Sequence, residues 1–211
     1  MAKKPSFSEP SLVLATANAA KGREMAELLA GVPFRILTLR DFPDVALPAE
    51  GAVSYGDNAL LKARAVAAAT GHLALADDSG IEVDALSGRP GVLSARYGGD
   101  GLSDSERNAL MLRELADVPR ARRTARYRCV IAICSPEGRE ATVEGVVEGV
   151  LLDAPSAATG GFGYDPLFFY PPLNATFADI PAAAKHAVSH RGRAMARARE
   201  ILLRWRAGTQ P

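Results

Sequence analysis

Apolar runs and helical repeats alternate along the first third of the chain. The continuous apolar run Leu12 to Ala15 predicts a buried strand, and the alternating stretch Arg35 to Leu39 predicts a second one. Between them, apolar residues at helical spacing predict a helix that Gly31 ends. An Ala-rich helix is expected from Asp57 to Thr70, where Gly71 stops it.

The pattern changes at Asp77-Asp78-Ser79-Gly80, directly after the apolar run Leu73 to Ala76. We expect the strand to stop there, with two adjacent carboxylates at its end. Carboxylates are costly to bury unless they are paired or bound to metal, and α/β proteins place ligands at strand ends. Asp77 and Asp78 are therefore candidates for metal binding and acid/base chemistry. The alternative is ordinary turn chemistry, which Asp, Ser and Gly all favour.

The second half of the chain predicts two long strands and a terminal helix. Thr124 to Cys134 and Glu140 to Leu151 have the pattern of strands, and the short polar segment between them suits an antiparallel hairpin. The sheet is then mixed. Ser103 and Glu106 form the sequence signature of a helix capping box. The last helix is expected to begin near Ser189.

Charge and composition limit the classes of partner and compartment. Against 24 Asp and Glu, the 25 Lys and Arg give the 211 residues a net charge of only +1, so nothing favours nucleic acid or membrane as the main partner. No stretch approaches the roughly 20 apolar residues of a membrane span, and residues 1–10 lack a signal core. We expect a flexible tail over residues 1–10 and a cytoplasmic location. Cys129 and Cys134 are expected to be buried, reduced residues.

Several isolated polar residues are candidates for a phosphate site. A strand that feeds a polar loop and a helix N-terminus is a generic anion site, to which Lys21 adds a cation. Lys62 falls beside the apolar stripe of the Ala-rich helix, and its alternative role is that of a lysine snorkelling to solvent. Glu50 lies in a loop and matters only if the fold brings it to Asp77 and Asp78.

The segment Gly160 to Pro166 interleaves glycines with two aromatic residues, Phe162 and Tyr164. Glycines let the backbone approach a ligand closely, and aromatic rings can cover its flat face. The alternative is a tight turn that buries both rings. His190, considered alone, is more typical of a structural histidine than of a catalytic one.

Six short motifs follow one another along nearly the whole chain. They are Thr16 to Lys21, Asn58 to Ala63, Ala76 to Gly80, Pro90 to Tyr97, Gly160 to Phe168 and Ser189 to Ala194. Together they resemble the family of noncanonical purine nucleoside triphosphate pyrophosphatases, which hydrolyse inosine, deoxyinosine and xanthosine triphosphates. The acidic loop around Glu50 matches the family only loosely, so the loop acid that completes the metal site stays open.

The resemblance implies an α/β fold with a long mixed sheet flanked by helices, and two lobes with an active-site cleft between them. Residues 11–211 would form this single two-lobed domain. The implied activity is Mg²⁺-dependent hydrolysis of ITP, dITP and XTP to the monophosphate and pyrophosphate, which cleanses the nucleotide pool. The expected partners are a purine nucleoside triphosphate and a second copy in a homodimer, with no stable nucleic acid and no membrane.

The resemblance also implies roles for individual residues. Asp78 would be the general base and a metal ligand, and Glu50 and Asp77 would be further metal ligands. Lys21, Lys62 and Lys185 would neutralise the triphosphate. The purine would lie against Phe162 or Tyr164. The full set of implied substrate-binding residues is Thr16, Asn18, Lys21, Lys62, Ser79, Phe162, Gly163, Tyr164, Asp165, Lys185, His190 and Arg191.

Two other functions remain open from the sequence. One is a noncatalytic nucleotide-binding or RNA-binding module that uses the Arg-rich segment Arg191 to Arg206 as a basic face, which predicts salt-sensitive binding. The other is a pyrophosphatase for other modified or standard nucleotides, because the phosphate machinery would be the same.

Overall fold

The computed structural model describes residues 10–51 and 54–208. Except for Pro10, the tail expected over residues 1–10 therefore lies outside the described residues. Within the described ranges, none of the helices has the length and apolar character that crossing a membrane requires.

One mixed sheet organises the described residues. Its seven strands lie in the order β2-β1-β3-β4-β5-β6-β7. Strand β1 pairs parallel with β2 and β3, whereas β6 pairs antiparallel with β5 and β7. The predicted α/β fold with a mixed sheet flanked by helices is confirmed. The strands are β1 (Ser11–Leu14), β2 (Arg35–Thr38), β3 (Leu73–Val83), β4 (Thr124–Cys134), β5 (Glu140–Leu151), β6 (Phe168–Tyr170) and β7 (Ala175–Thr176).

Side-chain caps define where several helices begin. Ser54 accepts a hydrogen bond from the backbone of Asp57, and Ser103 and Glu106 form the predicted capping box. Gly71, in the left-handed region at φ 69°, ends its helix as expected. The helix that Gly31 was expected to end stops earlier, with Leu28 as its last residue. The helices are α1 (Ala19–Leu28), α2 (Tyr55–Thr70), α3 (Asp104–Glu114), α4 (Ala182–Val188) and α5 (His190–Arg206).

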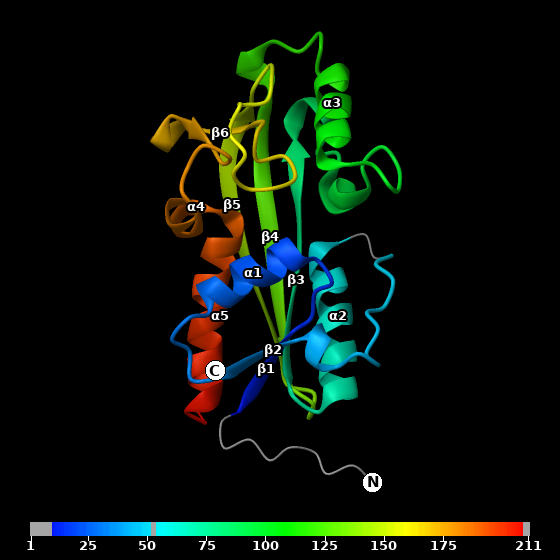
Figure 1. Cartoon of the computed structure of the whole chain (residues 1–211), viewed down its shortest axis with the longest axis vertical. Helices are drawn as coiled ribbons and strands as arrows, with labels where there is room; N and C mark the ends of the chain where they lie inside the picture. Colours follow the sequence, from blue (N-terminus) through cyan, green and yellow to red (C-terminus); the bar gives the residue numbers. More distant parts are fainter. Residues whose placement is uncertain (1–9, 52–53, 209–211) are drawn as a thin grey trace. The chain divides into compact units, whose positions relative to one another are not determined.

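The chain divides into two compact units. The first unit comprises Met1–Asp78, Val130–Val143 and Met195–Pro211, and the second comprises Ser79–Cys129 and Glu144–Ala194. Strands β3, β4 and β5, the long strands in Figure 1, have residues in both units. The expected cleft between lobes stays a prediction.

Each unit has an apolar core of its own. In the first unit, small side chains of α2, including Ala59, Ala63 and Ala67, pack with Val13 of β1. In the second unit, aromatic residues such as Phe168 pack with aliphatic residues of β3 and α3. The two cysteines are free and buried, as expected. Burial raises the pKa of the Cys134 thiol to about 11, which makes it a poor nucleophile.

The expectation that a strand stops at Ala76 is wrong. Strand β3 runs without interruption from Leu73 to Val83, through Asp77-Asp78-Ser79-Gly80. Asp77 is fully buried and Asp78 is 4% exposed. Carboxylates tolerate such burial only when charged or hydrogen-bonding groups compensate them. The turn alternative fails as well, so the strand interior must supply those partners from elsewhere in the chain.

The start of α5 lies very close to β5 within the second unit. A Cβ atom added at Gly145 would be 2.1 Å from the carbonyl oxygen of His190 and 2.5 Å from the backbone nitrogen of Ala194. Because backbone atoms cannot move aside as the tip of a flexible side chain can, only glycine fits here.

We therefore predict that Gly145→Ala lowers the free energy of unfolding by at least about 1–3 kcal/mol, the usual cost of overpacking. Urea denaturation measures this change. The matched control is Gly56→Ala in α2, where the nearest atom to an added Cβ is 3.9 Å away. Alanine favours the helix there, so stability should hold or rise by about 0.5–1 kcal/mol. Equal stability of the Gly145→Ala protein and the parent would contradict this packing.

Candidate active site

The loop after β1 is ordered by its own side chains. Asn18 Oδ1 accepts hydrogen bonds from the backbone N–H groups of Ala20 and Lys21, at 3.0 and 3.1 Å, and so caps α1. Thr16 Oγ1 accepts from the N–H of Asn18 at 3.2 Å. Two of the three residues expected to bind substrate here therefore also shape the loop. Their bonds fix the position of Lys21 in the first turn of α1.

Lys21 is the charged partner of Asp77. Its Nζ lies 3.2 Å from Asp77 Oδ2, and its side chain is partly exposed, at 18%. An opposite charge at this distance offsets the cost of burying the Asp77 carboxylate. Asp77, implied as a further metal ligand, is thus paired with a lysine in this structure.

Lys62 is buried and donates hydrogen bonds to two acceptors. From α2 its Nζ donates to the backbone carbonyl of Asp77 at 2.7 Å and to Glu50 Oε1 at 2.5 Å. Only 7% of its side chain is exposed, so the alternative that it snorkels to solvent is wrong. The loop acid Glu50 is therefore brought to the Asp77 segment, as its candidacy required.

Asp78 receives a hydrogen bond that the sequence reasoning missed. Asn58 Nδ2 donates to Asp78 Oδ2 at 2.9 Å, and both side chains are buried. A usable signal was present, because Asn58 and Lys62 are four residues apart on α2 and so share one face of the helix.

The surroundings of Asp78 tune its basicity. Burial raises the pKa of its carboxyl group above the ordinary value, and the opposing effects of Lys62, of the Asn58 hydrogen bond and of Lys21 do not cancel that increase. The nearby charge of Glu50 raises the pKa further. Asp78 is therefore a better proton acceptor than an exposed aspartate.

The carboxylates of the first unit fit Mg²⁺ by their chemistry. Mg²⁺ prefers hard oxygen ligands and is commonly held by one or two carboxylates together with substrate phosphates. Asp78 and Glu50 are near enough for their charges to interact. Over residues 10–51 and 54–208, no three His, Cys, Asp or Glu residues form a complete metal cage. Asp78 and Glu50 are thus the two carboxylates of this unit that could hold Mg²⁺ together with substrate phosphates.

A buried ion pair supports the aromatic loop of the second unit. Lys185 Nζ lies 2.7 Å from Asp165 Oδ2, and both side chains are almost fully buried. The same oxygen accepts the backbone N–H of Phe162 at 2.8 Å. Lys185, expected to neutralise the triphosphate, is here bound to the loop. It lies on α4, a short helix that the sequence reasoning did not predict.

Phe162 is half-buried and lies beside two cations. Lys185 Nζ is 4.8 Å and Arg191 Cζ is 5.6 Å from the centroid of its ring. Both distances are typical of cation–π contacts. Arg191 is buried, and its Nη2 also donates to Ser79 Oγ of β3 at 3.1 Å.

Tyr164 points into the apolar core of the second unit. It is 4% exposed, and its hydroxyl donates to the backbone carbonyl of Ser94 at 2.9 Å. Of the two rings considered for the purine, Phe162 is therefore the one with accessible surface. Position 161 has no room for a side chain, because a Cβ atom there would lie 2.2 Å from Asp165 Oδ2. The alternative of a buried ring is thus confirmed for Tyr164, whereas the ligand-binding role of Phe162 stays a prediction.

His190 stacks on a tyrosine of the sheet. Its ring centroid is 4.6 Å from that of Tyr127, with an angle of 9° between the planes. Both rings are buried, so the imidazole orientation is fixed by packing.

All the implied site residues except Tyr164, together with Asn58, fall into two clusters, which we call the acidic cluster and the aromatic cluster. The acidic cluster, in the first unit, comprises Thr16, Asn18, Lys21, Glu50, Asn58, Lys62, Asp77 and Asp78. The aromatic cluster, in the second unit, comprises Ser79, Phe162, Gly163, Asp165, Lys185, His190 and Arg191. Their members Asp78 and Ser79 are neighbours in β3.

Comparison with known proteins extends the likeness to most of the chain. A dITP/XTP pyrophosphatase of Geobacter sulfurreducens is 55% identical over 185 residues, which is 88% of this chain and 92% of that protein. A protein of the same name from Thermus thermophilus is 46% identical over 200 residues, covering 95% of this chain and 94% of its own.

Solved structures agree with these sequence comparisons. A HAM1 protein from Coxiella burnetii superimposes with a TM-score of 0.83 at 36% identity, over 92% of this chain and 98% of the other. A nucleoside-triphosphatase, or dITP/XTP pyrophosphatase, from Mycobacterium abscessus gives a TM-score of 0.71 at 41% identity, over 89% of this chain and 98% of the other. The model of the Ham1 family matches residues 12–201, and the chain therefore belongs to the Ham1 family.

Proposed function

We propose that this chain hydrolyses the noncanonical purine nucleoside triphosphates ITP, dITP and XTP to the nucleoside monophosphate and pyrophosphate, with the help of Mg²⁺. The observation that carries the proposal is the acidic cluster, in which the buried carboxylate of Asp78 lies among the cations Lys21 and Lys62. Relatives at 55% and 46% identity that are named dITP/XTP pyrophosphatases support the choice of substrate.

Hydrolysis between the α and β phosphates needs a proton acceptor for the attacking water. Asp78 would accept that proton, since burial raises the pKa of its carboxyl group and Asn58 fixes its orientation. Without these effects, an aspartate with a pKa of about 3.9 is a weak base at neutral pH. The strand interior thus supplies a base whose position and basicity are both set by neighbouring residues.

The leaving pyrophosphate needs positive charge. Lys21 and Lys62 would provide it, because their ammonium groups already lie at the Asp77 segment next to the base. An ammonium group carries three N–H donors, and those of Lys62 engage Glu50 and the Asp77 carbonyl in this structure.

The metal would be held by Asp78 and Glu50, with Asp77 as a further ligand. When bound, Mg²⁺ polarises phosphate oxygens and lowers the pKa of a coordinated water. Asn58 would hold the Asp78 carboxylate, and Lys21 and Lys62 would hold the phosphates, close to the bound Mg²⁺.

The aromatic cluster would bind the purine. Phe162 would stack on the base, while His190, Arg191 and backbone N–H groups would offer hydrogen-bond donors to its edge. Inosine and xanthosine carry a 6-keto acceptor where adenine has an amino donor. Donors from the protein therefore favour inosine and xanthosine over adenine. A site that leaves buried polar groups unpaired can reject the wrong substrate by roughly 10⁴.

The alternative of a nucleic-acid-binding helix is not favoured, because several arginines of α5 serve the fold. Arg191 contacts Ser79, and Arg193 donates to the carbonyl of Val146 at 2.7 Å. Arg199 donates to the carbonyls of Leu28 and Ala30, at 2.8 Å each. The homodimer stays a prediction of the family resemblance, and the cytoplasmic location stays a prediction from the composition of the chain.

We predict that the purified protein with Mg²⁺ releases pyrophosphate from dITP and XTP. The kcat/KM for these substrates should exceed that for dATP by a factor on the order of 10⁴. The assay separates pyrophosphate from orthophosphate, and chelation with EDTA should stop turnover. Comparable rates on dITP and dATP would refute the edge recognition. Release of orthophosphate alone would refute the reaction.

We also predict that Asp78→Asn lowers kcat about 10²- to 10⁴-fold, which is the usual contribution of a general base. Binding of dITP should persist, since Lys21 and Lys62 remain in place. Steady-state kinetics and calorimetric titration measure the two quantities. The matched control is Asp44→Asn at an exposed loop position, which should leave both unchanged. Near-normal turnover of the Asp78→Asn protein would disprove the assignment.

A further inference from the structure

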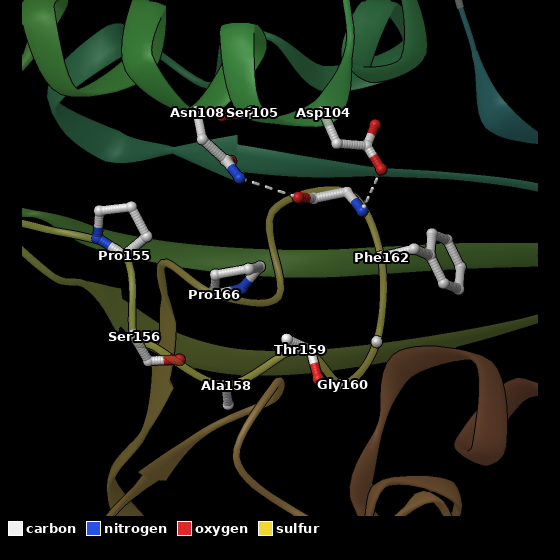
Figure 2. A pocket seen from close by; sticks show the side chains of 12 residues that line it. Asp104, Ser105, Asn108, Pro155, Ser156, Ala158, Thr159, Gly160, Phe162 and Pro166 are labelled. Carbon is white, nitrogen blue, oxygen red and sulfur yellow. Dashed lines mark hydrogen bonds between the residues drawn. The ribbon is translucent and has the colours of Figure 1, made fainter.

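The backbone of Gly163 is held from α3 at both of its polar groups. Its N–H donates to Asp104 Oδ2 at 2.7 Å, and its carbonyl accepts from Asn108 Nδ2 at 3.1 Å. Figure 2 shows both side chains pointing from α3 toward the loop. Because Asp104 and Asn108 are four residues apart, they share one face of the helix. One helix face therefore fixes one residue of the aromatic loop.

This loop residue needs external support. Gly163 has a φ of +63°, and a glycine backbone can leave such a conformation easily because no Cβ restricts it. A pocket of about 260 Å³ lies beside it, lined by Asp104, Ser105 and Asn108 of α3 and by loop residues between Pro155 and Pro166 (Figure 2). Packing is therefore incomplete on this side, which leaves the two hydrogen bonds as direct links between the helix and Gly163.

The residue before Gly163 is Phe162, the aromatic ring of the proposed purine site. On that side the backbone N–H of Phe162 is fixed by Asp165, and the ring lies beside Lys185 and Arg191. On the other side the fixed point is Gly163. The direction of the ring thus depends on two anchors, one within the loop and one on α3.

We propose that Asp104 and Asn108 are positioning residues for purine recognition, which hold Gly163 so that the ring of Phe162 stays in place to stack on the base. The inference rests on the proposed function of the aromatic cluster. Neither residue touches the acidic cluster in the contacts described above, so their effect falls on the base end of the substrate and not on its phosphates.

The two anchors differ in strength. Asn108 is 5% exposed, so its hydrogen bond is shielded from water, and its loss leaves the Gly163 carbonyl without this partner. The side chain of Asp104 is 54% exposed and also lies 3.5 Å from Arg107, so water can replace part of its role. Substitution at position 108 should have the larger effect.

The test measures nucleotide binding apart from turnover. We predict that Asn108→Ala raises both the KM for dITP and the Kd for inosine monophosphate about tenfold, the order of a lost base–aromatic contact. Asp104→Ala should raise them by a smaller factor. The kcat and the inhibition constant of pyrophosphate should stay within about twofold of the parent, as expected when uniform binding to the base is lost.

Two controls separate positioning from general destabilisation. Asp104→Asn keeps an oxygen that can accept the Gly163 N–H, and should restore KM and Kd to near the parent values. Ser103→Ala breaks the capping box of the same helix without removing either anchor, so it should lower Tm but leave Kd unchanged. The exposed position of Asp104 also provides a variant that folds if Asn108→Ala does not.

The possible results separate the two proposals. Parent-like KM and Kd in both alanine variants would overturn the positioning role, as would an equal weakening of pyrophosphate inhibition. If the parent binds inosine monophosphate but releases no pyrophosphate from dITP, the proposed reaction fails while the Kd comparison still decides the positioning role. A parent that binds no purine nucleotide would overturn both.

Discussion

A carboxylate in the interior of a strand must be compensated, and this requirement organises the acidic cluster. Strand β3 carries Asp77 and Asp78 at almost complete burial. Lys21 neutralises the first and Asn58 hydrogen-bonds the second, and these come from the starts of two different helices. The helix caps at Asn18 and Ser54 therefore do more than stabilise α1 and α2. They fix the first turns of the two helices that carry Lys21 and Asn58.

The same compensation prepares the site for chemistry. Incomplete neutralisation leaves the pKa of Asp78 raised, so the residue that is costly to bury is also the better base. The cations that stabilise the buried acids are the ones a triphosphate would need. The aromatic cluster also contains a buried ion pair whose members contact a candidate binding residue. Asp165 accepts the backbone N–H of Phe162, and Lys185 lies over the face of its ring.

Much of the fold could be predicted from local pattern. The strands Thr124–Cys134 and Glu140–Leu151 have the predicted bounds, because their alternation is long and a polar turn separates them. The capping box at Ser103 is equally local. The continuation of β3 beyond Ala76 could not be predicted in this way. Asp, Ser and Gly favour a turn by themselves, and the partners that keep them in a strand come from distant parts of the chain.

The sequence named candidate site residues, but it did not predict their contacts. Motifs proposed Asp78, Lys62 and Phe162 as candidates, yet they did not place Tyr164 in the core, and they did not predict the hydrogen bonds that Asn58 and Asn108 donate. These contacts are single hydrogen bonds between residues far apart in the sequence. Helical spacing can place Asn58 on the same face as Lys62, but it does not say which distant residue that face meets.

The central proposal is that Lys21 and Lys62 bind the phosphates of the nucleotide and that Phe162 stacks on its purine. The most direct measurement is a crystal structure of the Asp78→Asn protein with dITP and Mg²⁺. The account predicts phosphate oxygens at hydrogen-bonding distance from Lys21 and Lys62, and the purine stacked on Phe162. A triphosphate bound away from both lysines, or a base that does not contact Phe162, would contradict it.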